Sequence, residues 1–120
     1  MNCNCANTEN IIQFVKGTTV NISFIFDEDI TSYSYANFGI AKNYGETPII
    51  NENVSISADN TVNIELEPSQ TDDFTEFLNG KTSAQYIWWL DVIDSDEGIR
   101  INVFPQTGEP APLCIVYKHV

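Results

Sequence analysis

Gly80, Lys81 and Thr82 form the triplet found at the centre of phosphate-binding loops, so nucleotide binding is the first chemistry to consider. Such a loop needs a second glycine five residues earlier, a strand before it and a helix after it, so that backbone amides and a helix N-terminus face the anion. Position 75 is a threonine, and the local pattern predicts a helix before the triplet and a strand after it. The sequence therefore argues against nucleotide binding.

Three cysteines and one histidine are the candidates for soft-metal binding or nucleophilic catalysis. Cys3 and Cys5 lie too close together to link distant parts of a fold, and their spacing is not the Cys-x-x-Cys of zinc sites. Cys114 lies in an apolar run and is expected to be a small buried hydrophobe. His119 is a lone histidine near the C-terminus, where solvation is commoner than catalysis. We expect no metal, no cofactor and no enzymatic activity.

The acidic stretch Asp94 to Glu97, followed by Gly98, offers alternating carboxylates that could suit calcium. It lacks the third ligand, the spacing to glycine and the distal glutamate of a helix-loop-helix calcium loop. A hairpin turn is the favoured interpretation, with calcium as the alternative.

The 17 acidic and 5 basic residues leave a formal net charge of −12, which repels nucleic-acid phosphates and anionic lipid surfaces. No apolar run approaches the roughly 20 residues of a membrane-spanning helix. The first ten residues lack the basic start and apolar stretch of a signal peptide. We therefore expect no nucleic-acid partner, no membrane partner and synthesis in the cytoplasm.

Alternation of apolar and polar residues with a period of two predicts mostly strands. Residues 18–29 show this pattern, and residues 84–94 are apolar on both faces, as in the middle of a sheet. Residues 54–66, with a turn at 58–60, predict a hairpin. Residues 69–79 instead have helical spacing, with Ser69 or Thr71 as the N-cap and Gly80 as the stop. Seven or eight short strands indicate an antiparallel sandwich or barrel, of which we favour the sandwich.

Aromatic residues concentrate in two of the predicted strands. They could form a platform on which a sugar stacks, but strands of this kind usually bury such rings, so core packing is favoured. Trp89 is the best candidate for an exposed exception. The set comprises Tyr33, Tyr35, Tyr86, Trp88 and Trp89.

Three stretches, residues 16–29, 62–81 and 84–101, resemble the immunoglobulin-like domain at the N-terminus of bacteriophage baseplate upper proteins and related phage or prophage virion proteins. Such domains open with a glycine and an alternating strand, and cross through a short helix into an aromatic strand with an acidic hairpin. The resemblance implies an all-β, immunoglobulin-like sandwich of seven or eight strands over residues 11–120, preceded by an N-terminal arm at 1–10. The disulfide of antibody domains is absent, because Trp88 stands where its cysteine would follow Tyr86.

The same resemblance implies a non-enzymatic structural protein of the virion tail, baseplate or neck, made in the bacterial host cytoplasm. Its partners would be other virion proteins, with a homo-oligomer as a possibility. A capsid decoration protein is one alternative. A carbohydrate- or host-surface-binding module is another, and it would expose Trp89, or Tyr33 with Tyr35, beside a few polar groups. The candidate partner-binding residues are Asn2, Cys3, Asn4, Cys5, Trp89, Pro110, Pro112 and His119.

Overall fold

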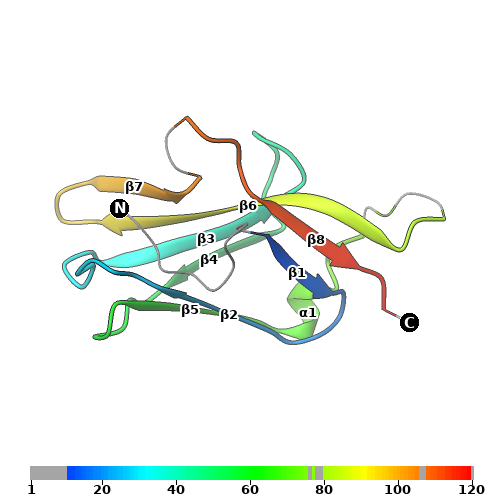
Figure 1. Ribbon diagram of the computed structural model, residues 1–120, viewed down its shortest axis with the longest axis horizontal. Helices are drawn as coiled ribbons and strands as arrows, with labels where there is room; N and C mark the ends of the chain where they lie inside the picture. The colour runs from blue at the N-terminus through cyan, green and yellow to red at the C-terminus, as the bar shows by residue number, and fades with distance from the viewer. Residues whose placement is uncertain (1–10, 76, 78–79, 106–107, 120) are drawn as a thin grey trace.

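A computed structural model describes residues 11–75, 77, 80–105 and 108–119 of the chain. Within these residues, eight strands and one short helix build two sheets that face each other (Figure 1). In chain order the elements are β1 (Ile12–Val15), β2 (Val20–Ile25), β3 (Tyr35–Ala41), β4 (Ile50–Val54), β5 (Thr61–Leu66), α1 (Pro68–Thr71), β6 (Ser83–Asp94), β7 (Ile99–Phe104) and β8 (Leu113–Tyr117).

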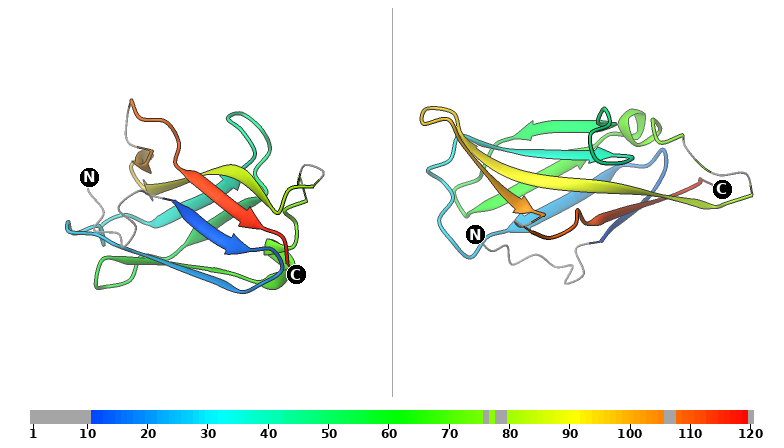
Figure 2. Two further views of the ribbon diagram at one scale, coloured as in Figure 1. Left: turned by 45° about the vertical axis from the view of Figure 1, so that its right-hand side comes forward. Right: turned by 90° about the horizontal axis from the view of Figure 1, so that it is seen from above.

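The larger sheet contains six strands in the order β1-β8-β6-β3-β4, with β7 also paired to β6. The long strand β6 organises this sheet, because β8 pairs with its first half and β7 with its second half (Figures 1 and 2). Strand β3 pairs along the other side of β6. Only β1 and β8 run parallel among the described pairs, and β2 and β5 form the second, two-stranded sheet. The prediction that residues 84–94 lie in the middle of a sheet is confirmed.

The core between the two sheets is centred on Trp88, which is 1% exposed. Its ring centroid lies 5.5 Å from that of Phe24 on β2, 6.0 Å from that of Phe38 on β3 and 5.1 Å from that of Phe104 on β7. One aromatic cluster therefore joins both sheets. This packing of two sheets, with Greek-key connections and a central buried tryptophan, is an immunoglobulin-like β-sandwich, and the expected all-β fold class is confirmed.

The helix expected over 69–79 is much shorter than predicted, since α1 spans only Pro68–Thr71. It begins at Pro68, before both proposed N-caps, because proline has the backbone geometry of a first helical residue. The actual N-cap is Glu67, whose backbone N–H donates to Oε1 of Gln70 at 2.9 Å. The helix stops at Thr71 because two aspartates follow, and Phe74 turns into the core, where its ring lies 4.9 Å from that of Tyr86.

The prediction of a hairpin over residues 54–66 is also wrong, because the two predicted strands do not pair with each other. A turn does occur there, with Asn60 at a φ of 60°, but the two arms share only an isolated bridge between Ile56 and Val62. Strand β4 pairs with β3 in the larger sheet, whereas β5 pairs with β2 in the smaller one. The chain crosses between the sheets at this turn because β5 completes the core opposite Trp88 through its apolar side chains.

Three of the five aromatic residues agree with the expected core packing: Tyr86 and Trp88 are both about 1% exposed, and the half-buried Tyr33 packs against the core. Cys114 is confirmed as a buried residue, and burial raises the pKa of its thiol to about 12. A thiol that stays protonated at neutral pH is a poor nucleophile and a poor metal ligand. Trp89 and Tyr35 are the exceptions, because both are half-buried and line one pocket on the outer face of the larger sheet.

Candidate functional site

The outer face of the six-stranded sheet carries polar residues that the strand register brings into one row. Asn37 on β3 is opposite Asn53 on β4 and Asp91 on β6, and Asp91 is opposite Asn102 on β7. Trp89 belongs to the adjacent row, where Gly39 separates it from Asn51. A residue two positions along a strand shares its face, so the two rows form a single surface. We call this surface the Trp89 face, made of Asn37, Asn51, Asn53, Trp89, Asp91 and Arg100.

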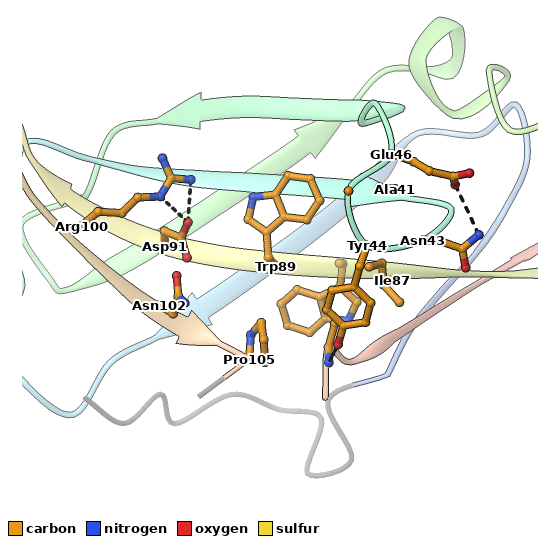
Figure 3. A pocket seen from close by; sticks show the side chains of 13 residues that line it. Ala41, Asn43, Tyr44, Glu46, Ile87, Trp89, Asp91, Arg100, Asn102 and Pro105 are labelled. Carbon is orange, nitrogen blue, oxygen red and sulfur yellow. Dashed lines mark hydrogen bonds and ion pairs between the residues drawn. The ribbon is translucent and has the colours of Figure 1, made fainter. Parts of the chain in front are cut away.

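The indole of Trp89 lies flat against β3 at Gly39. A Cβ atom at position 39 would come within 1.9 Å of Cζ2, 2.3 Å of Cε2 and 2.4 Å of Cη2 of that ring. Three ring atoms at similar distances mean that one face of the indole rests on the glycine backbone. Figure 3 shows the ring lying across β3, with Asp91 and Arg100 on one side and Tyr44 on the other.

Asn37 joins the polar groups of this face through both ends of its amide. Its Oδ1 accepts hydrogen bonds from Nε1 of Trp89 at 2.9 Å and from a terminal nitrogen of Arg100 at 3.0 Å. Its Nδ2 donates to Oδ1 of Asn51 at 2.7 Å and to Oδ1 of Asn53 at 2.9 Å. Asn37 is 7% exposed, and a buried amide with its bonds satisfied is held in one orientation. The position of the indole on β6 is therefore set by side chains from three other strands, β3, β4 and β7.

Asp91 and Arg100 form an ion pair at the edge of the network. The Arg100 guanidinium donates to Oδ2 of Asp91 from Nε at 2.7 Å and approaches it with a terminal nitrogen at 2.6 Å. The Asp91 side chain is 6% exposed and that of Arg100 is 54% exposed. Burial raises the pKa of Asp91, while the hydrogen bond and positive charge of Arg100 oppose this effect. The guanidinium of Arg100 thus provides the positive charge that an ionised Asp91 needs at this buried position.

Replacing Arg100 with glutamine should raise the pKa of Asp91 further, because burial would then act without opposition. At pH 7 the variant should lose about 1–3 kcal/mol of unfolding free energy, less than for a fully buried pair because Arg100 is partly solvated. A raised pKa means that the folded state gains stability as the pH falls, so this loss should shrink toward pH 4. The ¹³C shift of the Asp91 carboxyl and urea unfolding at several pH values would measure both effects. An unchanged or lowered pKa in R100Q would contradict this account.

Two adjoining hollows flank the indole, and both are lined by Trp89 and Arg100. One, of about 380 Å³, is mainly polar, with Asn37, Asn51 and Asn53 among its lining residues. The other, of about 320 Å³, is mainly apolar. Tyr44, 67% exposed, stands beside this second hollow, and its hydroxyl oxygen accepts the backbone N–H of Ala111. Pro105, Ile87 and Ala111 complete that side, as Figure 3 shows in part.

The structure brings few of the predicted partner-binding residues together. Trp89 is half-buried at the centre of the face, and the exposed Pro110 and half-buried Pro112 flank Ala111 beside it. The carbonyl of Pro112, just before β8, accepts the backbone N–H of Trp88 at 3.1 Å. His119 is exposed beyond β8, which pairs with the start of β6, away from Trp89. Asn2, Cys3, Asn4 and Cys5 lie outside the described residues.

The structure also bears on the acidic stretch Asp94 to Glu97 and on metal binding. Oδ1 of Asp94 accepts the backbone N–H groups of Asp96 at 3.1 Å and Glu97 at 3.4 Å, and the antiparallel pairing of β6 with β7 confirms the predicted hairpin. Among the described residues no cluster of three or more His, Cys, Asp or Glu side chains has an arrangement suited to a metal ion. No helix in the described part of the chain has the length and apolar character needed to cross a membrane.

The sequence interpretation missed every residue of the Trp89 face except Trp89. Asn51 and Asn53 alternate within β4, and Asp91 is the lone charge inside an apolar strand. Both patterns could have pointed to this face. The Asp91 pattern is the clearer one, because a charge in a buried strand requires a partner. Asn37 and Arg100 gave no such signal, since their roles depend on register between strands far apart in sequence.

No protein-family model matches the chain, and no curated protein matches it. Among solved structures, one described as murine CRIg aligns over 92% of this chain and 93% of that chain, with a TM-score of 0.46 and 11% sequence identity. Similarity at this level identifies no ligand and no partner for the protein.

Proposed function

We propose that this chain is a non-enzymatic recognition module that binds its partner through the Trp89 face. The observation that carries the proposal is the way in which Trp89 is held. Gly39 supports one face of the indole, and the network around Asn37 fixes its N–H. A large aromatic side chain fixed before binding loses little conformational entropy when a ligand arrives. Tryptophan and arginine are also the side chains that contribute most often to binding energy.

The chemistry of the face supports binding rather than catalysis. Its two charged residues, Asp91 and Arg100, already neutralise each other. An acid–base mechanism needs a titratable group free to exchange a proton with a substrate, and a nucleophilic mechanism needs an activated nucleophile. The asparagines that make up most of the polar surface supply neither, but they can both donate and accept hydrogen bonds.

The resemblance to baseplate upper proteins supports a place for this module in a phage particle. A strongly acidic domain would remain dispersed until a complementary surface binds it. In that setting the Trp89 face would meet either another virion protein or the surface of a host cell. The capsid decoration role stays a prediction.

Binding measurements on two matched double variants would test the proposal. N51A/N53A removes two exposed asparagines from the Trp89 face, and N21A/N63A removes two exposed asparagines from the outer side of β2 and β5. The chain would be immobilised and exposed to particles, and separately to intact cells, from the strain that carries its gene. We expect at least a ten-fold loss of binding for the first variant and little change for the second. Equal binding by both variants, or a loss confined to N21A/N63A, would refute the proposal.

A further inference from the structure

The Trp89 face has a composition that selects for one class of ligand, and this inference rests on the function proposed above. We propose that the face binds a neutral oligosaccharide, with a pyranose ring stacked on the free face of the Trp89 indole. The argument draws on the aromatic surface, the hydrogen-bonding groups, the charge and the shape of the hollows.

The aromatic surface suits the weakly polar C–H face of a sugar ring. One face of the indole covers Gly39, which leaves the other turned toward the two hollows that Trp89 lines. Tyr44 adds a second, largely exposed ring on the apolar side, and its hydroxyl is held by the backbone N–H of Ala111. A flat ring on the floor and a second ring at the side would contact a sugar on two surfaces.

The hydrogen-bonding groups next to the indole suit hydroxyl groups. Asn51 and Asn53 are both exposed, and each uses its Oδ1 to accept from Asn37. In the part of the chain that the structure describes, their Nδ2 groups donate to no protein acceptor, so they remain available to a ligand. Asn102, opposite Asp91, adds another exposed amide at the other side. Several planar amides beside one aromatic ring can bond neighbouring hydroxyls that both donate and accept.

The charge of the face favours a neutral ligand. Arg100 is its positive group, and Asp91 already compensates it at 2.6 Å. An acidic sugar would have to compete with that carboxylate and would also be repelled by a chain of net charge −12. The polar and apolar hollows adjoin at Trp89 and Arg100, and each lies near the lower end of the range of about 300–1,000 Å³ found for ligand pockets. A ligand of two or three sugar rings could occupy both.

Titration calorimetry and tryptophan fluorescence with defined sugars would test this inference. The panel would contain maltotriose, cellotriose, tri-N-acetylchitotriose and trisaccharides that end in galactose, mannose or rhamnose, with sialyllactose as the acidic comparison. We expect a neutral member to bind with a Kd below about 1 mM and to shift the emission of Trp89. W89A should weaken that binding at least ten-fold, and W89F should weaken it less because it keeps a ring. N21A, on the other sheet, should leave it unchanged.

Three outcomes of the saccharide measurements would overturn the inference. One is the absence of binding across the neutral panel, and another is binding of sialyllactose alone. The third is saccharide binding that W89A does not weaken. If the panel fails while N51A/N53A still loses its binding to particles or cells, the face binds another class of partner and the proposed function stands. If sedimentation shows a dimer that W89A dissociates, a second copy of the chain occupies the face instead.

Discussion

Replacing Trp88 with alanine is expected to lower the free energy of unfolding by about 3–5 kcal/mol. The side chain is 1% exposed and contacts aromatic rings on β2, β3 and β7, so its removal leaves a cavity between the two sheets. The surrounding rings come from different strands and cannot all move inward to fill that space. Urea unfolding followed by far-UV circular dichroism would measure the loss without relying on tryptophan emission.

The neighbouring residue provides a matched control for this measurement. Trp89 has the same side chain but lies half-buried on the outer face, so W89A should cost only about 1–2 kcal/mol through lost contact with Gly39 and Asn37. If W88A does not fold, W88F still allows the comparison, because a smaller ring leaves a smaller cavity. A loss in W89A equal to or greater than that in W88A would show that the core is not centred on Trp88.

Replacing Gly39 with alanine is expected to push the Trp89 indole off the sheet. The new Cβ would lie within 1.9 Å of Cζ2, a separation that no pair of non-bonded carbon atoms tolerates, so the side chain must swing away and lose its hydrogen bond to Asn37. The variant should lose about 1–3 kcal/mol of unfolding free energy, its tryptophan emission should shift to longer wavelength, and partner binding should fall at least ten-fold. Strand propensity alone predicts the opposite sign, because alanine is less flexible than glycine.

A double-mutant cycle separates this clash from other effects of the substitution. In a W89A background the ring is absent, so G39A should be neutral or slightly stabilising. The difference between the two backgrounds measures the contact between Gly39 and Trp89 directly. If G39A costs the same in both backgrounds, the loss comes from the β3 backbone rather than from the indole.

The local pattern of residues was enough to predict much of the sandwich. Alternation around Phe24 and Ile64 indicated which side of β2 and β5 faces the core, and both residues are buried. The double-sided apolar character of residues 84–94 indicated a central strand, and β6 is one. These predictions succeed because strand side chains alternate by backbone geometry, whatever the strand pairs with.

The extent of α1 and the partner of β4 could not be predicted in the same way. Phe74 leaves the helical path because Phe14 and Tyr86 form a pocket for its ring, at centroid distances of 5.3 Å and 4.9 Å. Strand β4 leaves β5 because β3 offers it a longer pairing. Both outcomes depend on contacts with residues far away in the sequence, which local propensity does not contain.

The sequence by itself determined that the chain folds mostly into strands and that its acidic charge disfavours nucleic acid and anionic lipid, and it named Trp89 as the best candidate for a tryptophan outside the core. Only the tertiary structure decided that Trp89 lies on Gly39 and that Asn37, Asn51, Asn53 and Arg100 surround it. Those residues come from separate strands, and a shift of register by one residue would turn each strand's members of the face to the opposite side of the sheet. Burial of the core sets that register, so the candidate site is a consequence of how the whole sandwich packs.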